Sequence, residues 1–198
     1  MNIGIVIGRI GDIDGVGLET EKWIQTLEQM GHETYILSGM FKGAIVPPER
    51  QTLLPLLSFS SPECEWEQNR AFFLPPDDPD ELLSHIDNSA HNIAGEIFGW
   101  VLRNRIDVIL SENASALPCH LSMGLGLKMA VENMNVQVVT HDHDFAWERG
   151  KRYESSFPEI RKLVNDVFPL RSSDQVRHAV INSAAQAELR RRFGIDAT

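Results

Sequence analysis

The sequence predicts an α/β protein with a doubly wound, mainly parallel, Rossmann-like sheet. Three observations lead to this prediction: the 198 residues fit one domain, short apolar or β-branched runs recur along the chain, and helical patterns separate them. The runs that we interpret as strands are residues 3–7, 34–38, 106–110, 136–140 and 178–182. Strands that alternate with helices favour parallel pairing.

Four segments have helical periodicity: residues 16–30, 80–104, 117–133 and 183–193. Gly31 and Gly194 follow the first and the last of these helices as stop signals, and Ser183 with Gln186 forms a capping box. The proline-rich stretch 41–79 departs from the pattern, so we expect an excursion with short strands at 51–59 and 71–74. The chain ends just after the last helix, where another strand is expected to begin, which we interpret as a cut.

Composition excludes several classes of protein. The formal charge of −10 is spread along the chain and disfavours nucleic acid as a partner. No apolar run reaches the ~20 residues of a membrane span, and the first residues do not resemble a signal peptide. Cys64 and Cys119 form no spaced pair, so we expect neither a disulfide framework nor a cysteine zinc site. A cytoplasmic location follows as the expectation, and association with further copies of the chain stays open.

A glycine-rich segment follows the first predicted strand. Residues 8–19 read GRIGDIDGVGLE and lead into a helix, an arrangement that suits an anion because backbone N–H groups point at it. Gly15 and Gly17 would allow a ligand to approach the backbone closely. The segment is neither a dinucleotide fingerprint, since Thr20 replaces the third glycine, nor a P-loop. The alternative is a simple turn whose helix is capped by Asp14.

Polar residues also follow the third and fourth predicted strands. In parallel sheets, ligands bind beyond the carboxyl ends of the strands. Glu112 and Asn113 can face such a cleft, although Asn113 or Ser115 can equally cap the next helix.

The segment after the fourth predicted strand contains the highest concentration of side chains suited to catalysis or ligand binding. In an extended chain, His141 and His143 share one face, and Asp142 and Asp144 share the other. A neighbouring carboxylate can fix the tautomer of a histidine for acid–base or ligand roles. A hydrated polar loop is the alternative.

Four motifs resemble a known family in their order along the chain: GVGLET at 15–20, EN at 112–113, HDHDF at 141–145 and VINS at 180–183. The chain resembles the N-terminal, acceptor-side Rossmann-like domain of the retaining GT-B glycosyltransferases, which include sucrose-phosphate synthases. The HDHDF motif with Trp147, Glu148 and Arg149 is similar to a branch that makes glucosylglycerate-type compatible solutes.

This resemblance implies roles for single residues. Gly15, Val16 and Gly17 would lie against the donor diphosphate and the acceptor. His143, or alternatively His141, would contact the transferred sugar as the catalytic group, oriented by Asp142 or Asp144. Two further groups are assigned to substrate binding: the strand-end residues Glu112, Asn113 and Asp142, and the basic residues Arg149, Lys151 and Arg152, which could hold an anionic acceptor.

The resemblance also implies a second domain. In this family the sugar nucleotide is held mainly by a C-terminal Rossmann-like domain, and nothing in residues 1–198 corresponds to it. We therefore expect a retaining hexosyltransferase that needs no metal or cofactor, with a nucleotide-sugar donor and a small, anionic or sugar acceptor. The isolated chain should bind the donor weakly and be inactive, because positioning and diphosphate stabilisation require both walls of the cleft.

Two rival interpretations remain. In a metal-dependent hydrolase, His141, His143 and an aspartate would hold Zn²⁺ or Mn²⁺, but the sequence offers few further ligands. In a stand-alone module, the same cleft would bind a sugar phosphate without catalysis. The sequence itself does not identify the sugar, the nucleotide base or the acceptor.

Overall fold

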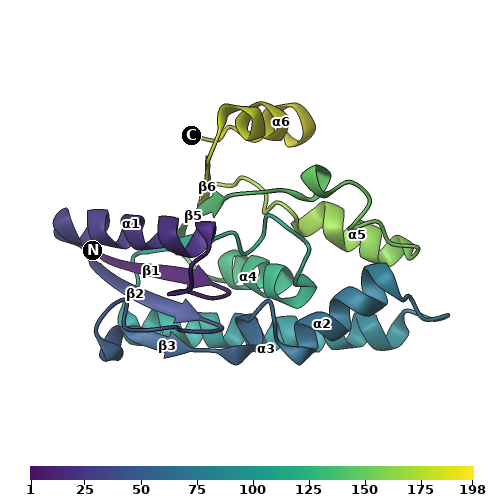
Figure 1. Cartoon of the computed structure of the whole chain (residues 1–198), viewed down its shortest axis with the longest axis horizontal. Helices are drawn as coiled ribbons and strands as arrows, with labels where there is room; N and C mark the ends of the chain where they lie inside the picture. Colours follow the sequence, from purple (N-terminus) through teal and green to yellow (C-terminus); the bar gives the residue numbers. More distant parts are fainter.

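The protein contains one six-stranded sheet, parallel throughout, with strand order β3-β2-β1-β4-β5-β6. The computed structural model describes residues 1–198 (Figure 1). The strands are β1 (Asn2–Ile7), β2 (Glu33–Ser38), β3 (Gln51–Leu53), β4 (Val108–Glu112), β5 (Gln137–Asp142) and β6 (Val176–Val180). The helices are α1 (Gly15–Gln29), α2 (Pro62–Gln68), α3 (Asp80–Asn104), α4 (Leu121–Asn133), α5 (Pro158–Val167) and α6 (Ser183–Phe193). This order confirms the predicted doubly wound, Rossmann-like architecture.

Helices cover both faces of the sheet because its strands are apolar on both sides. Ile5 and Ile36 pack with Ile24 of α1 on one face. On the other face, Val6, Ile109 and Val138 pack against α3 and α4 in the largest core cluster. Figure 1 shows α1 and the α3–α4 pair on opposite sides of the strands. The alternation of side chains along each strand therefore decides which layer a residue faces.

The predicted strands were correct in order, but the last three are displaced. The third is shifted two residues toward the C-terminus, to Val108–Glu112, and the fourth ends two residues later, at Asp142. The fifth is shifted two residues toward the N-terminus, to Val176–Val180. These shifts place Glu112, His141 and Asp142 inside strands rather than in the loops after them.

The proline-rich excursion contains helices where a second strand was predicted. Gln51–Leu53 is a strand, as predicted, although it is shorter. Residues 71–74 are not a strand, because α2 continues directly into a π-helix at Asn69–Phe73. The α2 helix and α5 both begin with proline at the first helical position, where the missing N–H costs nothing.

The predicted N-cap residue was correct for α1 and wrong by one residue for α6. The Asp14 carboxylate accepts a hydrogen bond from the Gly17 amide, as an N-cap should. For α6 the cap is Asn182, which accepts from Ala185, so the predicted Ser183 capping box is wrong. In α4 the helix begins at Leu121, four residues later than predicted.

The last residues of the chain pair with the edge of the sheet. Ala197 forms a parallel bridge with His178 of β6, and Thr198 exchanges backbone hydrogen bonds with His178 and Val180. At the place where the sequence predicts a further strand, the structure has this isolated bridge beside the six-stranded sheet. None of the helices is long and apolar enough to cross a membrane.

Candidate functional site

The carboxyl ends of β1, β4 and β5 meet at the point where the strand order reverses. The chain leaves β1 toward β2 on one side and reaches β4 on the other, which makes this edge the usual ligand crevice of an open parallel sheet. Glu112 and His141 are register partners across β4 and β5. Their side chains consequently lie next to each other on one face of the sheet.

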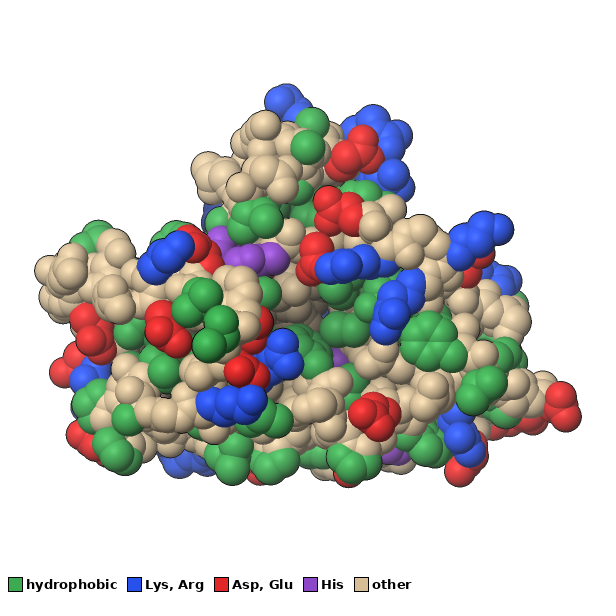
Figure 2. Space-filling view, in the orientation of Figure 1, with side chains coloured by type: hydrophobic (Ala, Val, Ile, Leu, Met, Phe, Trp, Pro, Cys, Tyr) green, Lys and Arg blue, Asp and Glu red, His purple; other side chains and the backbone are tan.

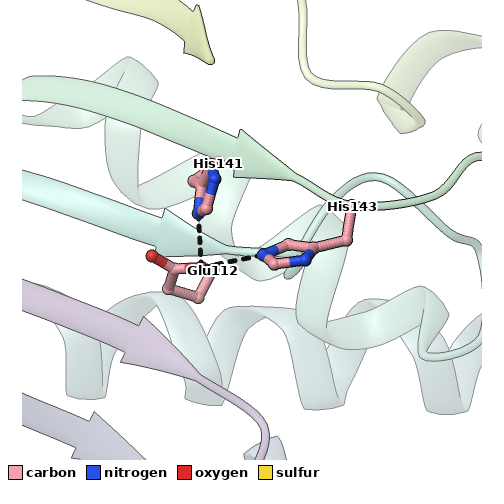
Figure 3. A group of neighbouring side chains, drawn as sticks. All are labelled: Glu112, His141 and His143. Atoms are coloured by element: carbon pink, nitrogen blue, oxygen red, sulfur yellow. Dashed lines mark hydrogen bonds and ion pairs between the residues drawn. The ribbon is translucent and has the colours of Figure 1, made fainter. Parts of the chain in front are cut away.

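A buried carboxylate holds the two histidines together (Figure 3). Nδ1 of His141 lies 2.9 Å from Oε2 of Glu112, and Nε2 of His143 lies 3.5 Å from the same oxygen. The two imidazole rings are 4.6 Å apart and meet edge to face. Because a carboxylate accepts hydrogen bonds, Nδ1 of His141 carries the proton and its Nε2 is free for a further contact.

Burial and charge act in opposite directions on His141. Burial is the largest single effect and lowers the pKa of this imidazole. The hydrogen bond and charge of Glu112, together with the smaller contributions of Asp142 and Glu19, outweigh burial, so the pKa of His141 is raised above its usual value. The arrangement therefore favours an imidazolium that can donate from both nitrogens.

The same three side chains could hold a metal ion. Their nearest ligand atoms all lie within 4.8 Å of one another, two nitrogens and one carboxylate oxygen. The direct hydrogen bond between Glu112 and His141 already accounts for their positions without an ion. A closed structural zinc site would also require a fourth ligand, and Glu112, His141 and His143 form the whole cluster.

A pocket of about 540 Å³ opens beside this cluster. It is lined by Gly15, Glu19, Trp23, His141, His143, Val180 and Ile181. Figure 2 shows histidine side chains, in purple, in the notch between the α1 side and the α6 side of the molecule. Its volume lies within the range of about 300 to 1,000 Å³ that is typical of ligand pockets.

Four pocket residues were not among the predicted site residues: Glu19 and Trp23 of α1, and Val180 and Ile181 at the end of β6. Trp23 is half-buried, and its ring meets His141 edge to face at 5.4 Å. Glu19 lies one turn earlier on the same face of α1. The signal that could have found Glu19 and Trp23 is their i, i+4 spacing directly after the glycine-rich loop.

Asn113 fixes the chain after β4 to the chain after β5. Its side-chain oxygen accepts from the His143 amide at 3.1 Å, and its side-chain nitrogen donates to Asp144 at 3.0 Å. Its backbone is left-handed, with φ of 53°, a conformation that asparagine tolerates better than most residues. Asn113 therefore positions His143 and does not cap the next helix.

Comparisons with known proteins agree with this architecture. No protein-family profile matches the chain. Two proteins named mannosylglucosylglycerate synthase are similar to it: that of Thermotoga maritima is 33% identical over 199 residues, and that of Petrotoga mobilis 28% over 204 residues. Each match covers 99% of this chain and 43% of the relative. The chain thus spans less than half the length of these relatives.

Two solved structures share the fold. A lipopolysaccharide outer core galactosyltransferase superimposes with a TM-score of 0.53 at 11% identity, over 97% of this chain and 42% of its own. The UDP-GlcNAc 2-epimerase of Methanocaldococcus jannaschii gives 0.50 at 13% identity, over 99% and 43%. The chain has the fold of one lobe of a GT-B glycosyltransferase. The resemblance to an N-terminal GT-B glycosyltransferase domain of the glucosylglycerate-type branch is confirmed, and the relatives give no support to the hydrolase alternative.

Within this GT-B lobe, the carboxylate that orients the histidines differs from the predicted one. Asp142 is fully buried and points to the opposite face of β5, where its Oδ2 accepts from Thr140 at 2.9 Å. Asp144 bonds Asn113 and pairs with Arg149. Glu112 orients the rings instead, because parallel pairing brings the end of β4 beside His141.

The predicted basic residues do not line the GT-B pocket. Arg149 forms an ion pair with Asp144. Arg152 lies over the rings of Phe73 and Tyr153, and Lys151 is exposed. None of the three belongs to the pocket lining.

The glycine-rich loop reaches the pocket at one residue. Gly15 lines it and has open space around its α-carbon. Gly17 is buried, and its amide is already bound to the Asp14 carboxylate. That negative charge at the start of α1 makes the Gly17 amide a poor place for a diphosphate, and Val16 packs against the core.

Proposed function

We propose that this chain is the N-terminal, acceptor-side lobe of a retaining hexosyltransferase. Together with a second Rossmann-like lobe of the same polypeptide, it would transfer a hexose from a nucleotide sugar to a small acceptor. The observation that carries the proposal is the coincidence of whole-chain similarity to two glycosyltransferases with a pocket at the switch point of the sheet.

The name of these relatives suggests the substrates. A mannosylglucosylglycerate synthase makes a product with a mannosyl, a glucosyl and a glyceryl unit, so a mannosyl donor and glucosylglycerate are the first pair to test. The relatives are 33% and 28% identical to this chain, a level at which donor or acceptor can differ within one fold.

In this proposal the histidines bind and orient the transferred sugar. His143 and the free Nε2 of His141 supply hydrogen bonds to sugar hydroxyls, and Glu112 keeps the His141 ring in place. The Glu112 and Glu19 carboxylates add negative charge near the pocket, which stabilises the positive charge that develops on the anomeric carbon in glycosyl transfer.

No metal or cofactor is needed in this scheme. The charge of the leaving diphosphate would be balanced by basic groups and helix N-termini of the second lobe rather than by this chain. No lysine or arginine lines the pocket of this chain, which supports the assignment of diphosphate binding to the second lobe.

The experiment compares the 198-residue chain with the full product of its gene. Both are incubated with UDP-, GDP- and ADP-sugars and with glucosylglycerate, and products are measured by mass spectrometry. We expect transfer by the full gene product and none by the chain alone. Robust transfer by the isolated chain, or a gene that ends after Thr198, would refute the two-lobe proposal and favour a stand-alone binding module.

A further inference from the structure

The pocket beside the histidines has the chemistry of a site for an uncharged sugar. Its walls supply one indole ring from Trp23, two imidazole rings, and the carboxylate of Glu19, with Val180 and Ile181 on the far side. Carboxylates and imidazoles hydrogen-bond hydroxyl groups, and an indole offers a flat apolar surface for the C–H face of a pyranose. These residues come from two separate parts of the fold, α1 and the ends of β5 and β6.

The charges around the pocket disfavour an anion. The only lysine close to it, Lys22, is exposed and already bonded to Oε2 of Glu19 at 2.7 Å. The buried Glu112 carboxylate already lies against the two imidazoles, His141 and His143. A phosphate or carboxylate placed here would therefore face the Glu19 carboxylate, with the buried Glu112 behind the histidines and no unpaired arginine or lysine, which is unfavourable in a partly desolvated pocket.

Trp23 and Glu19 are also placed to act together. Both line the main pocket, and both line a smaller hollow of about 180 Å³ with Lys22 and Thr26. Trp23 packs against the core cluster of Ile5 and Ile24, but neither Trp23 nor Glu19 is fully buried, so both keep exposed surface on the pocket.

We propose that this pocket is a subsite for an uncharged hexosyl unit, with the Trp23 indole as its stacking surface and the Glu19 carboxylate as its hydroxyl acceptor. The inference rests on the proposed function and narrows it. An anionic end of the acceptor, such as a glycerate carboxylate, lies outside the pocket, and Trp23 and Glu19 select for the ring. This assignment differs from the sequence expectation, which placed an anionic acceptor near Arg149.

The test is a binding titration of the 198-residue chain by NMR. The indole N–H signal of Trp23, one of four tryptophans, is assigned by its loss in Trp23→Leu. Methyl α-glucoside and methyl α-mannoside are the neutral probes, and glucose 6-phosphate and D-glycerate are the charged ones. We expect the neutral glycosides to shift the Trp23 signal and the charged probes to bind at least about tenfold more weakly.

The variants separate stacking from charge. Trp23→Leu should weaken glycoside binding about tenfold. Glu19→Gln should weaken glycoside binding less than Trp23→Leu does. It should also reduce the difference in affinity between methyl α-glucoside and glucose 6-phosphate, because the carboxylate charge that repels the phosphate is removed. Gln25→Ala, an exposed position on the same helix, serves as the matched control and should bind like the wild type.

Two results would overturn the inference. One is an unshifted Trp23 signal with about 100 mM neutral glycoside, a concentration that fills even a weak site. The other is tighter binding of glucose 6-phosphate or glycerate than of the neutral probes. Either result, combined with transfer by the full gene product, rejects the subsite while the glycosyltransferase proposal stands.

Discussion

Glu112 controls the protonation of His141. The two side chains are register neighbours joined by a 2.9 Å hydrogen bond, and the charge of Glu112 is one of the contributions that raise the pKa of His141. Glu112→Gln removes that charge while keeping the shape of the side chain, so the pKa of His141 should fall below its usual value, since burial then dominates. An NMR pH titration of the histidine ring protons measures this.

The matched control for this prediction is Asp144→Asn. Asp144 lies nearby but bonds Asn113 and Arg149 rather than the ring. Its substitution should leave the pKa of His141 close to the wild-type value. If the two variants shifted the pKa equally, Glu112 would not be the orienting carboxylate.

Asp142 and His178 are a second titrating pair, buried on the other face of the sheet. Thr140 links them, with its hydroxyl oxygen 2.9 Å from both Asp142 Oδ2 and His178 Nδ1. Burial, only partly offset by the Thr140 hydrogen bond, raises the pKa of Asp142 from 3.8 to about 7. Burial also lowers the pKa of His178 from 6.5 to about 4, helped by Arg171 and Arg177.

These two shifts give opposite dependences of stability on pH. As the pH rises from 3.8 to about 7, the unfolded state loses the Asp142 proton first, so the Asp142 contribution destabilises the fold. As the pH falls from 6.5 to about 4, the unfolded state binds the His178 proton first, so stability falls with decreasing pH. The two contributions nearly cancel in the wild type.

Asp142→Asn should expose the His178 contribution alone. Across this window the variant should gain stability with rising pH relative to the wild type, by up to about 4 kcal/mol. Urea unfolding at several pH values measures the difference. A variant whose stability followed the wild-type pH profile would show that Asp142 titrates normally.

The sequence predicted the residues of the site better than their partners. His141 and His143 share a face, as strand alternation requires. Glu112 lies 29 residues earlier, and its contact with His141 depends on the register between β4 and β5, which no local pattern encodes. The displaced strand ends had the same cause, because pairing extends β5 through polar residues that resemble a loop.

At the scale of elements, a side chain of α2 caps the N-terminus of α4, which has no capping side chain of its own. The N-cap residue of α4, His120, makes no side-chain capping bond. Glu67 of α2, fully buried, accepts from the Ser122 amide at 3.1 Å and lies 3.5 Å from His120. Glu67→Gln should therefore lower the free energy of unfolding by about 2 kcal/mol, whereas Glu65→Gln, exposed on the same helix, should change it little. Equal effects in urea unfolding would contradict this role.

Two glycines test how closely α3 and α4 pack. A methyl group at Gly126 would lie 2.8 Å from the Ala90 carbonyl oxygen and 2.9 Å from Ile93, whereas Gly95 has nothing within 4 Å. Gly126→Ala should destabilise the protein by about 1 to 3 kcal/mol. Gly95→Ala should stabilise it by about 0.5 to 1 kcal/mol through helix propensity. Thermal unfolding of the two variants should therefore move in opposite directions.

The elements that the sequence missed lie where local signals conflict. The prolines of the excursion indicated loops, yet Pro62 is the first residue of α2. Residues 71–74 are apolar and aromatic, as in a strand, but the preceding helix continues into them. Tertiary packing of Ala71 with Leu82 and Ile86 outweighs strand propensity there.

At the scale of the whole molecule, topology brings the polar strand ends together. Strand order and right-handed connections were predictable from the alternation of strands and helices, and they gather the ends of β1, β4 and β5 at one edge. The shape of the pocket was not predictable, since α1 contributes Glu19 and Trp23 from a helix that resembled a simple packing element.

The most direct measurement is glycosyl transfer by the full gene product and by its His143→Ala variant. With a mannosyl donor and glucosylglycerate, we expect His143→Ala to lower kcat/KM by about 100-fold. His91→Ala, an exposed histidine on α3, should stay within about twofold of the wild type. Full activity in His143→Ala, with folding verified by circular dichroism, would contradict the assignment of this pocket to the sugar.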